Sequence, residues 1–134
     1  MNWDFYDGFF GKPWVYSVIP NMGGKTAYTG YLSFYAKGGS EALNSPNKGR
    51  LEGFGMAPEG IENNEVLYEL ISDMGWQSAE VNLEDWLRNY CVNRYGAYPH
   101  DMKKAWELLR RSCYGSFTDH PRFNWQCRPG LLGR

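Results

Sequence analysis

The sequence has few cysteines, no long hydrophobic run and almost no excess of charge of either sign. Its 14 Lys and Arg residues are balanced by 15 Asp and Glu residues, so nucleic acid is not expected as a partner. No segment reaches the roughly 18 apolar residues of a membrane span, so no membrane partner is expected either. The first residues, Met1 to Asp4, lack a basic stretch followed by an apolar one, and no signal peptide is predicted.

Metal and cofactor ligands are also scarce. The two histidines, His100 and His120, have no second ligand at helical spacing, so no metal and no cofactor are predicted. The chain has only three cysteines and no C-x-x-C motif. This odd, sparse set favours a role as small buried hydrophobic residues over a disulfide, a metal site or a nucleophile. The three residues are Cys91, Cys113 and Cys127.

Aromatic residues, by contrast, are abundant. They make up 17% of the 134 residues, with 6 Trp, 10 Tyr and 7 Phe. This content argues against disorder and indicates either a dense core or stacking surfaces for flat or ring-shaped ligands. The length is about that of one domain.

The first half of the chain predicts two strand–helix pairs. Trp14–Ile19 and Leu51–Met56 are rich in β-branched or apolar residues and are bounded by turn formers, as expected of strands. A helix is predicted to begin at Thr26 and to stop at Gly38-Gly39, and a second to begin at Asn63 or Asn64. This order, strand–helix–strand–helix, implies parallel strands joined by right-handed crossovers.

The second half predicts helices alone. Asn82 followed by Asp85 resembles a capping box, and the helix that it begins is expected to end at Gly96. A further helix is predicted from Asp101 or its neighbours, and no regular structure is predicted in the tail from Gly115 to Arg134.

The most chemically suggestive stretch surrounds Glu59. Pro58 biases the residue before it toward an extended conformation, so a strand is expected to end there and Glu59 to follow it. In α/β folds, chemistry takes place beyond the carboxyl ends of the strands. The alternative is a loop glutamate that is mildly stabilised near the next helix N-terminus. Two strand–helix units cannot close a domain, so the chain has either a compact fold of its own or belongs to something larger.

Several motifs resemble the alpha-N-acetylglucosaminidases, glycoside hydrolase family 89. The signature segment is G-M-A-P-E-G-I-x-x-N-E-V-x-Y-x-L, from Gly55 to Leu70. The segment P-W-V-Y-S-V-I-P-N-M-G-G, from Pro13 to Gly24, is similar to the family's preceding barrel strand and its N-x-G-G loop. Further matches are the R-Y-G of Arg94 to Gly96, the A-W-x-L-L-x-R-S-x-Y of Ala105 to Tyr114, and Arg128-Pro129.

The resemblance implies an α/β fold class, a fragment of a (β/α)8 TIM barrel with two late βα units. Residues 1–75 would form the late part of the barrel, and residues 76–134 the start of an all-helical C-terminal domain. The implied activity is exo-acting, retaining hydrolysis of terminal α-linked N-acetylglucosamine, with an N-acetylglucosamine-terminated glycan as the partner. By family, the location would be secreted or periplasmic in bacteria and lysosomal in animals.

The resemblance also implies roles for single residues. Glu59 falls on the family's nucleophile, Asn21 becomes a candidate substrate ligand, and Glu62 and Glu65 are expected to act as capping or supporting groups. The family's acid/base glutamate lies on an earlier barrel strand, so the missing N-terminal barrel portion is an expected partner. The leading hypothesis is a fragment that is inactive alone. The alternatives are a non-catalytic carbohydrate-binding or interaction module, and an unrelated small helical scaffold.

Overall fold

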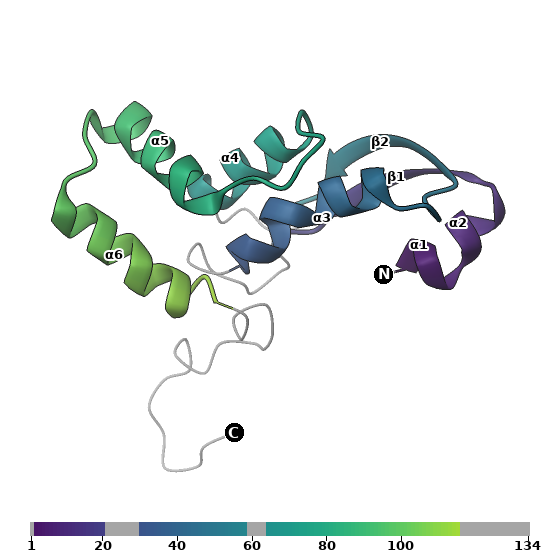
Figure 1. Cartoon of the computed structure of the whole chain (residues 1–134), viewed down its shortest axis with the longest axis horizontal. Coiled ribbons are helices and arrows are strands. Elements are labelled where there is room, and N and C mark those ends of the chain that lie inside the picture. Colours follow the sequence, from purple (N-terminus) through teal and green to yellow (C-terminus); the bar gives the residue numbers. More distant parts are fainter. Residues whose placement is uncertain (1, 21–29, 59–63, 116–134) are drawn as a thin grey trace, which may run out of the picture.

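The computed structural model describes residues 2–20, 30–58 and 64–115 of the chain. In these ranges the elements follow in the order α1 (Asn2–Phe5), α2 (Asp7–Phe10), β1 (Pro13–Val18), α3 (Leu32–Asn44), β2 (Arg50–Met56), α4 (Glu65–Met74), α5 (Leu83–Tyr95) and α6 (His100–Arg111). Figure 1 shows an elongated arrangement, with α1 and α2 at one end and α5 and α6 at the other. The predicted irregular tail lies outside the described residues from position 116 onward.

The two strands form a parallel sheet. The register runs from Pro13 opposite Arg50 to Val18 opposite Met56. The prediction of two adjacent parallel strands is confirmed, and each strand begins one residue earlier than expected.

Helix α3 corrects one prediction, because it continues through Gly38 and Gly39 to Asn44. These glycines serve packing and do not end the helix. A Cβ at Gly38 would lie 2.2 Å from Tyr16 Oη, and one at Gly39 would lie 2.9 Å from Phe54 Cε2. The aromatic side chains of the sheet therefore occupy the space that side chains on this part of the helix would need. That tertiary gain outweighs the low helix propensity of glycine.

The other helices agree more closely with their sequence signals. Asn82 caps α5, since its side chain accepts hydrogen bonds from the backbone N–H groups of Glu84 and Asp85. Gly96 ends α5 in the left-handed conformation, with φ of 79°. The apolar side chains of α4 lie on one face and are all buried: Val66, Leu67, Leu70, Ile71 and Met74.

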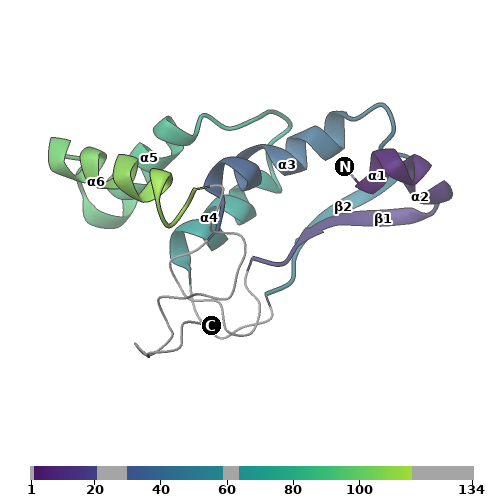
Figure 2. The same ribbon diagram turned by 90° about the horizontal axis from the view of Figure 1, so that it is seen from below.

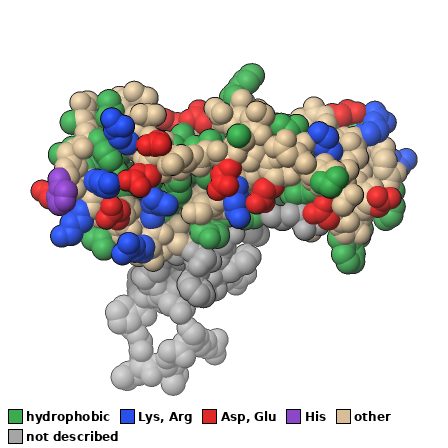
Figure 3. All heavy atoms as spheres, viewed as in Figure 1, with side chains coloured by type: hydrophobic (Ala, Val, Ile, Leu, Met, Phe, Trp, Pro, Cys, Tyr) green, Lys and Arg blue, Asp and Glu red, His purple; other side chains and the backbone are tan. Residues whose placement is uncertain are grey.

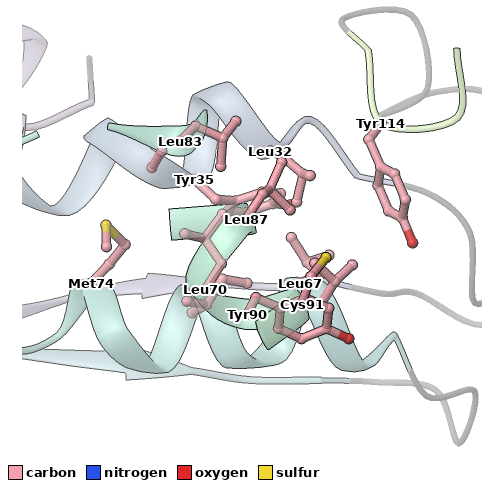
Figure 4. Close-up of a cluster of buried hydrophobic side chains, with 13 residues drawn as sticks. Leu32, Tyr35, Leu67, Leu70, Met74, Leu83, Leu87, Tyr90, Cys91 and Tyr114 are labelled. Atoms are coloured by element: carbon pink, nitrogen blue, oxygen red, sulfur yellow. The ribbon is translucent and has the colours of Figure 1, made fainter. Parts of the chain in front are cut away.

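The main hydrophobic cluster joins α3, α4 and α5 (Figure 4). Leu32, Leu67, Leu70 and Leu87 are almost completely buried in it. The cluster draws its residues from both sides of position 75, so the segment before this position and the helices after it pack on one another. Cys91 is also buried there, as predicted for a small hydrophobic residue, and Cys113 is half-buried with a free thiol.

Among the described elements, helices cover only one face of the sheet (Figure 2). The covered face carries Tyr16 and Phe54, whose rings stack with centroids 5.5 Å apart and pack toward α3. The opposite face, here called the bare face, consists of Val15 and Ser17 on β1 with Gly53 and Gly55 on β2. Val15 is 53% exposed on it, and Ser17 is also exposed.

Two features complete the described surface. Residues 7–10, labelled α2, form a left-handed turn, because Asp7, Phe9 and Phe10 have φ between 48° and 56° and Gly8 has φ of 59°. Lys and Arg side chains are interspersed with Asp and Glu over the face shown in Figure 3. Within the described ranges, no helix is both long and apolar enough to cross a membrane.

Candidate active site at the carboxyl edge of the sheet

The carboxyl ends of β1 and β2 lie side by side. Val18 and Met56 are the last register partners, and the backbone N–H of Ala57 donates to the Val18 carbonyl at 2.9 Å. The two chain segments that follow the strands therefore start from one edge of the sheet. This edge is the place where α/β folds assemble ligand sites.

Two of the three predicted site residues lie outside the described residues. Asn21 is three positions after Val18, and Glu59 is three positions after Met56. Glu62 also lies outside them. What the structure provides is the pair of strand ends from which both predicted residues follow.

The third predicted site residue, Glu65, is the first residue of α4. Its carboxylate accepts a hydrogen bond from the guanidinium of Arg94, in the last turn of α5, and the two form a half-exposed ion pair. This contact raises the pKa of Arg94 above its usual value. Arg94 belongs to the R-Y-G motif, but no sequence pattern pairs it with Glu65, which lies 29 positions earlier.

Of the two asparagines predicted to begin this helix, Asn63 lies outside the described residues and Asn64 does not act as a side-chain cap. It occupies the N-cap position of α4, but its side chain makes no capping hydrogen bond. Instead its Oδ1 accepts a hydrogen bond from the Tyr114 hydroxyl at 3.2 Å. The exposed fractions are only 5% for Asn64 and 4% for Tyr114. Figure 4 shows Tyr114 reaching in from the segment that follows α6.

Arg94 also lies over an aromatic ring. Its guanidinium carbon is 5.9 Å from the centroid of the Tyr90 ring. Burial raises the pKa of Tyr90 to about 12, with nearby Tyr95 adding to the increase. Tyr90 is therefore neutral at physiological pH and offers Arg94 the face of an uncharged ring, an arrangement that is weakly attractive.

The rest of the described surface has no candidate metal site, but it has a hollow beside β2. No group of three or more His, Cys, Asp or Glu side chains in the described ranges could hold a metal ion. The hollow, of about 400 Å³, is lined by Phe54, Gly55 and Met56 of β2 and by Ile71 and Trp76. Trp76, which is 90% exposed, stands at its rim.

Fold and strand edge together define the class of an α/β protein built from parallel βα units. Residues 1–78 match the family described as the alpha-N-acetylglucosaminidase (NAGLU) tim-barrel domain. This match covers more than half of the 134 residues, and the chain belongs to that family.

Relatives agree with this assignment. The chain is 38% identical over 107 residues to the alpha-N-acetylglucosaminidase of Homo sapiens, across 79% of this chain and 14% of the human protein. It also resembles the family 89 glycoside hydrolase of Clostridium perfringens in complex with 2-acetamido-1,2-dideoxynojirmycin. That comparison has a TM-score of 0.79 at 27% identity and covers 96% of this chain.

The same bacterial enzyme in complex with its substrate GlcNAc-alpha-1,4-galactose gives a TM-score of 0.80 at 26% identity. The chain spans 15% of the length of that enzyme. The suspected family is therefore confirmed, and the chain corresponds in length to a small part of its relatives.

Proposed function

We propose that this chain is the nucleophile-bearing part of a retaining alpha-N-acetylglucosaminidase. The observation that carries the proposal is the parallel pairing of β1 with β2, which end together at Val18 and Met56. Asn21 and Glu59 each follow three positions later and match the family's motifs. In a barrel, such positions face the active site.

Glu59 would be the nucleophile. Its carboxylate attacks the anomeric carbon of the terminal N-acetylglucosamine, and the bond from that carbon to the glycosidic oxygen breaks. A second carboxyl group gives its proton to the departing oxygen. Water then attacks the glycosyl ester, the second group takes a proton from the water, and the Glu59 carboxylate is restored. Asn21 would hydrogen-bond a sugar hydroxyl or the N-acetyl group.

The second carboxyl group would come from the N-terminal barrel portion, because the family resemblance places the acid/base glutamate on an earlier barrel strand. A retaining glycosidase needs it at about 5–5.5 Å from the nucleophile. Glu65 begins α4 close to Glu59 in sequence, but it is already paired with Arg94, which suits a supporting role better than proton transfer. The chain by itself is therefore expected to be inactive, with the N-terminal barrel portion as its partner.

The bare face supports that partner. In this proposal α3 and α4 are outer barrel helices, so the face turned away from α3 is the barrel interior. Barrel interiors are filled by layers of side chains from alternate strands. Gly53 and Gly55 add no side chain to such layers, and a Cβ at either position would meet only Val15 or Ser17 at ordinary contact distance. No described residue requires these two positions to be glycine, but the absence of side chains here would leave room for larger side chains from other strands.

The proposal also divides the chain into two domains. We assign residues 1–75 to the barrel and 76–134 to the start of a helical domain, which agrees with a family match that ends at residue 78. A non-catalytic sugar-binding module remains the alternative, and it predicts sugar binding without turnover.

Replacement of Glu59 in an assembled enzyme tests the proposal. The chain is joined to, or mixed with, the preceding barrel strands of a family 89 hydrolase and assayed with an aryl α-N-acetylglucosaminide. Glu59→Gln should abolish kcat, because the amide cannot form the glycosyl-enzyme intermediate. Glu62→Gln should cost far less, since it loses at most a helix-end interaction of about 0.3–1 kcal/mol. Near-normal turnover of Glu59→Gln would refute the assignment.

A further inference from the structure

The start of α4 is held from two sides by the helical part of the chain. Asn64 is bound by Tyr114, which lies 50 positions later. The next residue, Glu65, is bound by Arg94 of α5. Two consecutive residues are thus tied to two separate elements, and both ties come from beyond position 75.

Asn64 and Glu65 lie close in sequence to the proposed nucleophile, Glu59. Glu59 lies one position after Pro58, which follows β2, and five positions before Asn64. One end of the connection is anchored by the pairing of β2 with β1. The other end begins at Asn64, and its position depends on what holds the N-terminus of α4.

We propose that Tyr114 and Arg94 are positioning residues, through which the helical part fixes the start of α4 and thereby the connection that carries the nucleophile. The inference rests on the proposed function of Glu59. A retaining mechanism requires the two carboxyl groups to keep a narrow separation, and a misplacement of 1 Å can cost about a hundredfold in rate. Neither Tyr114 nor Arg94 needs to touch the sugar for this effect.

The two ties should differ in strength. The Tyr114–Asn64 hydrogen bond is buried, and hydrogen bonds in a low-dielectric interior are strong and costly to lose. The Arg94–Glu65 pair is half-exposed, so water and salt screen it. Tyr114 should therefore matter more than Arg94, and the effect of Arg94 should shrink at high ionic strength.

The test uses the assembled hydrolase described above and separates kcat from KM. Tyr114→Phe removes one hydroxyl and keeps the ring, and it should lower kcat by about tenfold with KM changed less than about twofold, as expected when only placement of the reacting group is lost. Its matched control is Tyr98→Phe, which removes a hydroxyl from another tyrosine that packs against the same cluster. The control should keep kcat.

The ion pair is tested by charge reversal. Arg94→Glu should lower kcat about threefold at low salt, an effect in the range of a half-exposed ion pair. The combined change of Arg94→Glu with Glu65→Arg should restore kcat. Lys103→Gln breaks the pair between Lys103 and Glu84, which links α6 to α5 without touching α4, and it should leave kcat unchanged.

The outcomes separate this inference from the function on which it rests. Full turnover in Glu59→Gln would overturn the proposed nucleophile, and the inference with it. Loss of turnover in Glu59→Gln, together with normal kcat in Tyr114→Phe, would overturn the positioning role alone. Equal losses in Tyr114→Phe and Tyr98→Phe would also overturn it, because they would indicate general destabilisation of the helical part.

Discussion

At the scale of single residues, glycine has two opposite roles in this chain. Gly38 and Gly39 are small because Tyr16 and Phe54 fill the space beside them. Gly53 and Gly55 have room for a Cβ, and neither has a positive φ. The first pair therefore serves packing inside the chain. The second pair has no packing constraint among the described residues, and the proposed barrel interior would supply one.

This contrast gives a stability prediction. Gly38→Ala gains up to about 1 kcal/mol of helix propensity, but the new Cβ would lie 2.2 Å from Tyr16 Oη. Because overpacking of a filled core costs about 1–3 kcal/mol, we expect a net loss of about 1 kcal/mol. Gly53→Ala is the control, and it should be neutral or slightly stabilising. Urea unfolding followed by circular dichroism measures both, and equal losses would contradict the packing argument.

At the scale of elements, the two asparagines at helix starts behave differently. Asn82 caps α5 with hydrogen bonds of 3.0 and 3.1 Å to the backbone. Asn64 stands at the corresponding position of α4, yet its side chain is held by Tyr114. The residue type made both positions suitable for a cap. The choice between capping and a distant hydrogen bond was decided by the segment that follows α6.

The cap of α5 gives the second stability prediction. Asn82→Ala should lower the free energy of unfolding by about 1 kcal/mol, because two backbone N–H groups lose their acceptor. Asn82→Asp keeps an acceptor at the same position and should retain most of the stability. Urea unfolding curves compare the variants, and a full loss in Asn82→Asp would show that the cap is not the cause.

At the scale of the whole molecule, the described part of the chain has a buried core but a sheet of only two strands. The cluster of α3, α4 and α5 is well buried, whereas the sheet has one bare face and, among the described elements, free outer edges. Exposed apolar groups on such a face favour association. The proposed barrel would cover the bare face and pair the edges.

Val15 and Leu108 provide a matched test of this proposal. They have similar exposed fractions, 53% and 58%, but Val15 lies on the bare face and Leu108 on α6. Val15→Lys should block assembly with the N-terminal barrel portion, because it would bury a charge in the interior without a partner. Leu108→Lys should leave assembly intact. Co-purification with the barrel portion measures both, and equal assembly would show that the bare face is not the interior.

The sequence by itself determined the two strands, the helices α4 to α6, their order and the family, but it did not predict α1 and α2. The strands could be predicted because β-branched and apolar runs stop at turn formers, and α5 because its cap and its terminal glycine act locally. The parallel pairing followed from the strand–helix order. The family motif around Glu59 pointed to the chemistry, although that residue and Asn21 lie outside the described part of the chain.

Only the tertiary structure decided how distant segments use these residues. Sequence propensity ended a helix at Gly38-Gly39, but two aromatic side chains from the sheet turned these glycines into packing positions within α3. Asn63 or Asn64 was predicted to begin α4, but the Asn64 side chain binds Tyr114, 50 positions later, and Glu65 binds Arg94, 29 positions later. Such contacts depend on how α3, α4 and α5 pack on one another. A local sequence pattern shows only which face of each helix is apolar, so it does not determine that packing.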